Sequence, residues 1–205
     1  HTLLAIETYR ASVLLAKDRG AFPIYNWDKE IKNPFLQRLF IEDSDLKDAM
    51  EKHGRRNIAL LTVAPTGSVS ICTQTTSGIE PVFLVTYKRR KKVNPNDVNV
   101  KISFVDELGD AWEEYKVFHH KFITWAEKQE YSKRQLEGMS DAELEKIVKK
   151  SPYYGATSND VDWVKKVKMQ GAVQKWVDHS ISVTVNLPAN VDENLVATVY
   201  QTAWQ

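Results

Sequence analysis

The chain has 205 residues, of which 42% are hydrophobic and 27% are charged, so it is long enough to bury the core of one domain or of one lobe of a larger one. Lys and Arg total 28 against 27 Asp and Glu, a balance that argues against a nucleic-acid surface or an acidic tail. No stretch approaches the roughly 20 apolar residues of a membrane span, and no signal-peptide pattern is present. The single cysteine gives neither a disulfide framework nor a zinc ligand set. We therefore expect a cytoplasmic protein that binds neither membranes nor nucleic acids.

The first part of the chain has the pattern of short helices. Apolar residues recur at helical spacing from Leu3 to Lys17, and Gly20 then offers a helix end. Two shorter helices are predicted over residues 35–40 and 46–53, the second opening near Ser44 and closing at Gly54.

A run of apolar residues from 57 to 63 predicts a strand buried on both faces, as in parallel α/β sheets. Pro65 would end this strand, because it lacks a ladder donor and restrains the residue before it to an extended conformation. In the turn that follows, Thr66 or Ser68 can cap a helix, and Gly67 lets the main chain approach a ligand closely. If a helical turn starts here, its first free N–H groups converge on one point that suits a phosphate. An ordinary strand-to-helix turn is the alternative for these residues alone.

Helices are also predicted in the second half of the chain. Apolar residues at helical spacing favour one from Trp112 to Ala126. Residues 140–143 form the pattern of a capping box for a helix that runs to Lys150. A further helix is expected to start at Asn159 or Asp160 and to continue through Trp176.

Three conspicuous features have simple structural interpretations. The basic run 88–92 predicts a solvated strand or loop edge, although it could steer polyphosphates. His119 and His120 are adjacent, so on a helix they would point about 100° apart and could not share one metal ion. Cys72 is expected to be a small buried residue without a catalytic role.

Residues 180–186 alternate sharply between polar and apolar side chains. Ile181, Val183 and Val185 would fall on one face of a strand, and the Ser and Thr residues with Asn186 on the other. In a barrel the apolar face would pack on helices and the polar face would line a cavity. An antiparallel sheet with one exposed face fits the alternation equally well.

Taken together, several segments resemble one family. Pro65-Thr66-Gly67-Ser68, residues 75–83, Tyr87-Lys88-Arg89-Arg90 and Val93-Asn94-Pro95 are similar to the large catalytic subunit of ribonucleotide reductases, in particular the adenosylcobalamin-dependent, class II type. A second block agrees in order and spacing: residues 169–188, with its Asn186-Leu187-Pro188, and residues 199–204. The similarity extends over essentially the whole chain.

The resemblance implies roles for particular residues. The family's turn binds the substrate's phosphates, and this role would fall to Pro65, Thr66, Gly67, Ser68, Val69 and Ser70. Gly78, Glu80 and Pro81 would shape the site rather than transfer protons. Ser182 and Asn186, on the polar face of their strand, are candidates to meet ribose hydroxyls.

The resemblance also implies a fold and partners. The family fold is a ten-stranded α/β barrel with parallel strands and surrounding helices, and residues 1–205 would be the second, C-terminal part of it, incomplete at both ends. The substrate would be a ribonucleoside di- or triphosphate and the cofactor adenosylcobalamin. The missing N-terminal half, from the same gene or from a separate chain, would be a partner, and the complete enzyme would be a homodimer.

This sequence departs from the family in its cysteines. The family needs a radical cysteine, two further thiols and an Asn-x-Cys-x-Glu pattern, whereas this chain has only Cys72. The chain is therefore expected to be inactive by itself and to have no catalytic residue of its own. A non-catalytic nucleotide-binding or assembly module derived from the same barrel is the alternative, and a third is a folding unit that does nothing alone and self-associates through exposed sheet edges.

Overall fold

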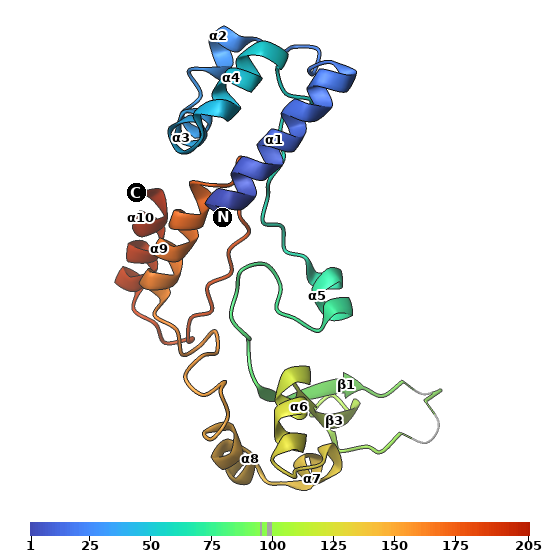
Figure 1. The fold of residues 1–205 in the computed structure, drawn as a ribbon. Helices are drawn as coiled ribbons and strands as arrows, with labels where there is room; N and C mark the ends of the chain where they lie inside the picture. Colours follow the sequence, from blue (N-terminus) through green and yellow to red (C-terminus); the bar gives the residue numbers. More distant parts are fainter. Residues whose placement is uncertain (95, 98–99) are drawn as a thin grey trace.

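The computed structural model describes residues 1–94, 96–97 and 100–205. Pro95, in one of the segments that carry the resemblance, lies outside the described residues. Figure 1 shows a group of N-terminal helices at one end, a hairpin with three helices at the other, and extended segments and a helix pair between them. No helix in the described part of the chain is long and apolar enough to cross a membrane.

The N-terminal helices enclose the first hydrophobic core. The helix that we predicted from Leu3 is α1 (Thr2–Arg19), and Gly20 follows it with a φ of 80° that favours glycine. The two predicted short helices are confirmed as α3 (Pro34–Glu42) and α4 (Ser44–His53), with the single turn α2 (Trp27–Glu30) before them. The core is built from Ala5, Tyr9, Val13, Leu36, Leu39, Phe40, Leu46 and Met50.

The prediction of a strand buried on both faces at 57–63 is wrong. The segment is extended but only half-buried to exposed, and its one ladder contact within the described residues is a parallel bridge between Val63 and Ile181. The Val63 N–H donates to the carbonyl of Ser180 at 3.2 Å, and Val63 accepts from the Ser182 N–H at 2.8 Å. Because the described residues supply a neighbour on one side only, the apolar run lacks the second neighbour that would make it an inner strand.

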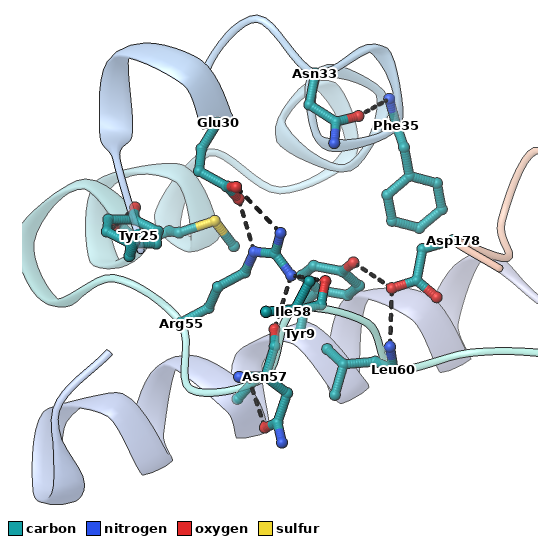
Figure 2. Close-up of polar contacts among 12 residues, drawn as sticks. Tyr9, Tyr25, Glu30, Asn33, Phe35, Arg55, Asn57, Ile58, Leu60 and Asp178 are labelled. Carbon is teal, nitrogen blue, oxygen red and sulfur yellow. Dashed lines mark hydrogen bonds and ion pairs between the residues drawn. The ribbon is translucent and has the colours of Figure 1, made fainter. Parts of the chain in front are cut away.

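Asp178 fixes this segment in place. Its carboxylate accepts hydrogen bonds from the backbone N–H groups of Leu60, at 2.9 Å, and Leu61, at 2.7 Å. It also accepts from the Tyr9 hydroxyl at 2.7 Å, so one side chain joins α1, residues 60–61 and the chain around residue 178 (Figure 2). Burial, together with the Asp178 carboxylate, raises the pKa of Tyr9 well above its usual range, so the phenol stays a donor.

Arg55 holds the start of the same segment. Its guanidinium pairs with Glu30 at 2.7 Å and donates to the carbonyls of Asn57 and Ile58 (Figure 2). The Arg55 and Glu30 side chains are only 5% and 13% exposed. Removing either one would leave an uncompensated buried charge and would strongly destabilise the protein. The pair therefore anchors the exit from α4 toward residues 57–63.

The other end of the molecule is an antiparallel sheet. Its strands are β1 (Thr86–Lys92), β2 (Phe104–Val105) and β3 (Ala111–Phe118), in the order β1-β3-β2. The basic run 88–92 lies in β1, an exposed edge strand, which confirms the solvated-edge interpretation. The predicted helix from Trp112 is wrong over residues 112–118. These residues form a strand because seven of them pair with residues of β1 in an antiparallel ladder.

Three helices cover this sheet and enclose a second hydrophobic core. They are α6 (His120–Lys128), α7 (Lys133–Gly138) and α8 (Asp141–Val148). The predicted capping box is confirmed: the Ser140 hydroxyl accepts from the Glu143 N–H, and the Glu143 carboxylate accepts from the Ser140 N–H. The core consists of Val85, Phe118, Phe122, Ala126, Leu136, Leu144 and Ile147, and we call residues 85–153 the hairpin unit.

The remaining helices are α5 (Gly67–Thr73), α9 (Trp163–Gln174) and α10 (Glu193–Trp204), of which α9 and α10 lie side by side (Figure 1). The helix predicted from Asn159 or Asp160 begins only at Trp163, because Asp162 is the residue whose side chain caps it. Residues 180–186 are extended, but Ile181 alone makes a ladder bridge.

The fold class is α/β, but the described residues do not form a ten-stranded barrel. Their one sheet has three antiparallel strands, and the only parallel pairing among them is the bridge at Val63. Parallel strands need neighbours on both sides to complete a closed sheet, and those neighbours would have to come from elsewhere.

Replacing Asp178 tests its role as an anchor. Asp178→Asn places an amide donor against a backbone or hydroxyl donor, so we expect it to lower the free energy of unfolding by about 1–3 kcal/mol. Tyr9→Phe removes one donor and leaves both backbone bonds, so its loss should be about 0.5–1.5 kcal/mol. Urea unfolding measures both, and an equal loss in the two variants would contradict the model of a shared anchor.

Asp43 predicts a pH dependence of stability. Its carboxylate accepts from Arg10 at 2.7 Å and caps α4 through the Leu46 N–H, and these bonds hold the pKa of Asp43 below its usual range. A lowered pKa gives stability that is present above the unfolded-state value and is lost as the pH falls through the folded-state value.

Asp43→Asn keeps a good helix cap but removes the charge. Its destabilisation should therefore be clear at about pH 7 and should shrink below about pH 4, where the wild-type carboxyl is also neutral. Thermal unfolding across this range is the measurement, and a pH-independent difference between the two proteins would argue against the charged pair.

Candidate functional site

The turn after Pro65 presents unpaired backbone donors. Thr66 precedes α5 with φ 51° and ψ 30°, a left-handed conformation that costs a non-glycine residue about 1–2 kcal/mol. The Thr66 hydroxyl does not cap the helix and instead accepts from the Gly78 N–H at 2.9 Å. In the described part of the chain, the N–H groups of residues 67–69 have no acceptor, since the first intrahelical bond is from Ser70 to Thr66.

Ser70 braces this turn from inside. It is only 8% exposed, its hydroxyl donates to the Gly67 carbonyl at 2.7 Å, and it lies 2.9 Å from the Ser77 hydroxyl. Because the Ser70 hydroxyl already has these two partners, the structure gives no direct support for a contact between this hydroxyl and a phosphate. That contact stays a prediction. The expectation that Cys72 is buried is wrong, because Cys72 is exposed. The helix α5 is short, and Ser70 is its one buried residue, so the face with Cys72 packs against no other part of the described chain.

The alternating segment 180–186 has two different environments. Ile181, Val183 and Val185 line an apolar groove with α9 and α10. Ser182, Thr184 and Asn186 face the opposite way, toward the turn and the loop after it. Glu80 fixes this arrangement, since its carboxylate accepts from the Thr184 N–H at 2.8 Å.

Two neighbouring pockets bring together residues that are distant in the sequence. The turn pocket, of about 170 Å³, is lined by Ala64, Pro65, Gly67, Ser77, Gly78, Glu80, Ser182 and Thr184. Five of the candidate site residues therefore share one cavity. The seam pocket, of about 460 Å³, lies beside it and includes Glu80, Pro81 and Asn186. Thr66, Ser68, Val69 and Ser70 line neither pocket, although they are neighbours of Gly67 on the turn.

The wall of the seam pocket that belongs to the hairpin unit contains His119 and His120. Burial and the nearby His120 and Lys121 lower the pKa of His119, so its imidazole is neutral near pH 7. Among the described residues, no three His, Cys, Asp or Glu side chains lie close enough to hold a metal ion. Glu80 is the one carboxylate among the residues that line these two pockets, and neither lining includes a Lys or Arg.

Sequence reasoning missed three residues of the site. Thr184 lines both pockets, and its place on the polar face with Ser182 and Asn186 was the signal that could have selected it. Ser77 supports Ser70, and Ser158 donates its N–H to the Val82 carbonyl at 2.8 Å. These two contacts follow from the path of the loop, which no local pattern indicates.

Comparison with known proteins shows the family of the chain. The family model for the ribonucleotide reductase barrel domain matches residues 1–205. The chain belongs to this family. Curated members at low identity include vitamin B12-dependent ribonucleoside-diphosphate reductases, 25% identical in Thermoplasma acidophilum and 28% in Mycobacterium tuberculosis, each over 96% of this chain. The ribonucleoside-diphosphate reductase subunit alpha of Chlamydia pneumoniae is 24% identical over 99% of the chain. The chain spans only 22%, 24% and 20% of these three relatives, respectively.

Glu80 offers a local test of the site's geometry. Glu80→Ala removes the acceptor of the Thr184 N–H, so hydrogen exchange at the Thr184 amide should accelerate. Glu80→Gln keeps an oxygen in the same place and should preserve most of the protection. Amide exchange followed by NMR would make the comparison, and unchanged protection of Thr184 in the alanine variant would show that the bond does not order this segment.

Proposed function

We propose that this ribonucleotide reductase barrel segment holds the phosphate groups of a ribonucleoside di- or triphosphate at the turn 65–70. The single observation that carries the proposal is the set of unpaired N–H groups of residues 67–69 beside the turn pocket. Backbone donors at a helix start, with the positive end of the helix dipole behind them, favour an anion. Holding the phosphates orients the ribose for chemistry, and such positioning can lower a reaction barrier by several kcal/mol.

The strained backbone of Thr66 supports the same proposal. A left-handed threonine persists only where its surroundings enforce it, and here the Gly78 N–H bond to the Thr66 hydroxyl does so. Gly67 adds open space, because no atom lies within 4 Å of where a Cβ would be. Main-chain donors can therefore be approached closely from outside.

Reduction of the ribose would need groups from outside this segment. Cys72 is the one thiol in the sequence, so a radical cysteine and a reducing thiol pair have to come from the remaining part of the reductase or from a partner chain. The names of the relatives suggest adenosylcobalamin as the cofactor of the complete enzyme. We further propose that the complete enzyme closes the ten-stranded barrel and is a cytoplasmic homodimer.

The described residues do not by themselves fit adenosylcobalamin. The cavity beside β3 and α6 has a volume of about 720 Å³, within the range of about 300–1,000 Å³ that suits drug-sized ligands. Adenosylcobalamin is much larger than such a ligand, so this cavity does not enclose it, and we assign the cofactor no residue here.

The alternative function is a nucleotide-binding or assembly module without catalysis. The lone cysteine favours this alternative over an independent enzyme. Mixing the chain with the remaining reductase segment, adenosylcobalamin and a dithiol separates the two. Formation of deoxyribonucleotide supports the reductase proposal, and nucleotide binding in an inactive mixture supports the module.

Substitution of Gly67 tests the phosphate contact directly. Gly67→Val has room in the free protein, but its side chain would stand where the phosphates approach the N–H groups. We expect nucleotide affinity to fall by about tenfold or more, because about 1.4 kcal/mol is enough for that change. Calorimetric titration with a ribonucleoside diphosphate gives the affinity.

Gly138→Val is the matched control, since its added Cβ also meets open space and Gly138 lies at the end of α7. It should leave nucleotide affinity unchanged. If the two variants lose the same small amount of melting temperature while only Gly67→Val loses affinity, the turn binds the nucleotide. Equal affinity in all three proteins would reject the proposal.

A further inference from the structure

The strand β3 has a neighbour along its whole length on one side only. On the side of β1, seven residue pairs join the two strands, from Trp112 to Phe118. On the other side, β2 supplies two pairs, with Ala111 and Trp112. In the described part of the chain, residues 113–118 of β3 therefore border an open sheet edge.

Ser103 shows which backbone groups of β3 point to this edge. The Trp112 carbonyl accepts from the Ser103 N–H at 2.8 Å, and the Glu114 N–H donates to the Ser103 hydroxyl at 2.9 Å. Backbone groups alternate in direction along an antiparallel strand, so those of Lys116 point the same way. Among the described residues, neither the N–H nor the C=O of Lys116 has a hydrogen-bond partner. Both groups can pair with an added strand.

The cavity of about 720 Å³ beside β3 and α6 runs along this edge. Five consecutive residues of β3, 114–118, line it. A cavity over one face of a sheet is lined by every second residue of a strand, because successive side chains point to opposite faces. The opposite wall comes from Ile123 of α6 and from Lys133 and Glu137 of α7. We call this cavity the edge groove.

The edge groove carries a positive charge that has no carboxylate partner. Lys116 and Lys88 lie directly opposite each other on β3 and β1, and like charges in such a pair repel. Lys88 pairs with Asp141 at 2.7 Å. The Lys116 ammonium donates instead to the carbonyls of Glu137 and Met139, and among the described residues it forms no ion pair. An anionic side chain beside Lys116 would therefore be attracted to the groove.

We propose that the edge groove binds an extended, acidic peptide segment of a partner protein as an additional strand beside residues 114–118. Its backbone would pair with the N–H and C=O of Lys116, the mode of recognition in which a peptide extends a sheet. The side chain opposite Lys116 would be Asp or Glu. Its two neighbours would lie on the other face of the sheet beside Tyr115 and Val117, where aromatic or β-branched side chains pack well.

A lone segment suits the edge groove better than a second copy of this chain. The edge of β3 is flanked by α6 and α7, and a copy that paired through the same edge would bring its own two helices into the groove. The edge groove shares no lining residue with the turn pocket. The inference is therefore independent of the proposed phosphate contact.

Capped five-residue peptides test the proposal on the intact chain. The probe Thr-Val-Glu-Val-Thr places Glu opposite Lys116, and Thr-Val-Lys-Val-Thr reverses its charge. A third peptide has the Glu sequence with methyl groups on its three central backbone nitrogens, which removes the donors that strand pairing needs. In titrations followed by NMR, the Lys peptide and the methylated peptide should each bind at least about tenfold more weakly than the Glu peptide.

Lys116→Gln removes the charge but keeps a side-chain donor for the α7 carbonyls. It should weaken binding of the Glu peptide by about three- to tenfold. Lys91→Gln is the matched control, because Lys91 is an exposed residue of β1 in the same sheet but outside the edge groove. It should leave the affinity unchanged, which separates a local contact from the general attraction of a basic surface.

Amide exchange at Lys116 provides a measurement that needs no variant. The Lys116 N–H should exchange rapidly in the free chain and become protected when the Glu peptide is bound. Protection already present in the free chain would show that the edge is covered, and would overturn the proposal. Failure of the Glu peptide to bind, or equal affinity of the methylated peptide, would reject strand addition. Equal affinity of the Glu and Lys peptides would reject an acidic partner.

Discussion

The arrangement of this molecule depends on the carboxylate of Asp178, which accepts three hydrogen bonds from two distant parts of the chain. The Tyr9 hydroxyl and the Leu60 N–H converge on it (Figure 2), and the Leu61 N–H donates to its other oxygen. Among the described residues, the segment 57–63 has one strand neighbour, so a ladder alone would leave many of its backbone groups unpaired. Asp178 accepts hydrogen bonds from two of its N–H groups. At the start of the segment, Arg55, paired with the Glu30 carboxylate, donates to the carbonyls of Asn57 and Ile58. The position of the turn at Pro65 follows from these side-chain bonds.

Around this anchored segment, the site is assembled from side chains that each hold a piece of backbone. The Thr66 hydroxyl accepts from the Gly78 N–H, and the Ser70 hydroxyl donates to the Gly67 carbonyl. The Glu80 carboxylate accepts from the Thr184 N–H. Each bond uses a polar group that would otherwise be free to meet a ligand. The groups left over are the N–H donors at the start of α5 and the polar edge of Asn186. The turn is a candidate anion site because its side chains stabilise the backbone while the N–H groups at the start of α5 stay available to a ligand.

The hairpin unit has its own core, its own helix caps and a charged edge strand, and it meets the rest of the chain at the seam pocket. On β1, Lys88, Arg90 and Lys92 pair with Asp141, Glu114 and Asp110, so much of the basic run is neutralised locally. Exposed pairs of this kind contribute little to stability, but charged side chains protect an edge strand from pairing with other chains. The basic run is thus explained by the sheet without a polyphosphate ligand.

The sequence by itself determined the elements whose signals are local: α1 and its end at Gly20, the capping box of α8, the two faces of residues 180–186, and the Pro-Thr-Gly-Ser turn. It also carried the family resemblance.

Tertiary structure decided the rest. Residues 112–118 became a strand because β1 pairs with them, and Cys72 is exposed because nothing in the described chain covers that side of α5. The union of Gly67, Glu80 and Ser182 in one pocket, and the bonds to Asp178, join residues up to 169 positions apart. Local patterns cannot encode such contacts, because they depend on how the segments between them fold.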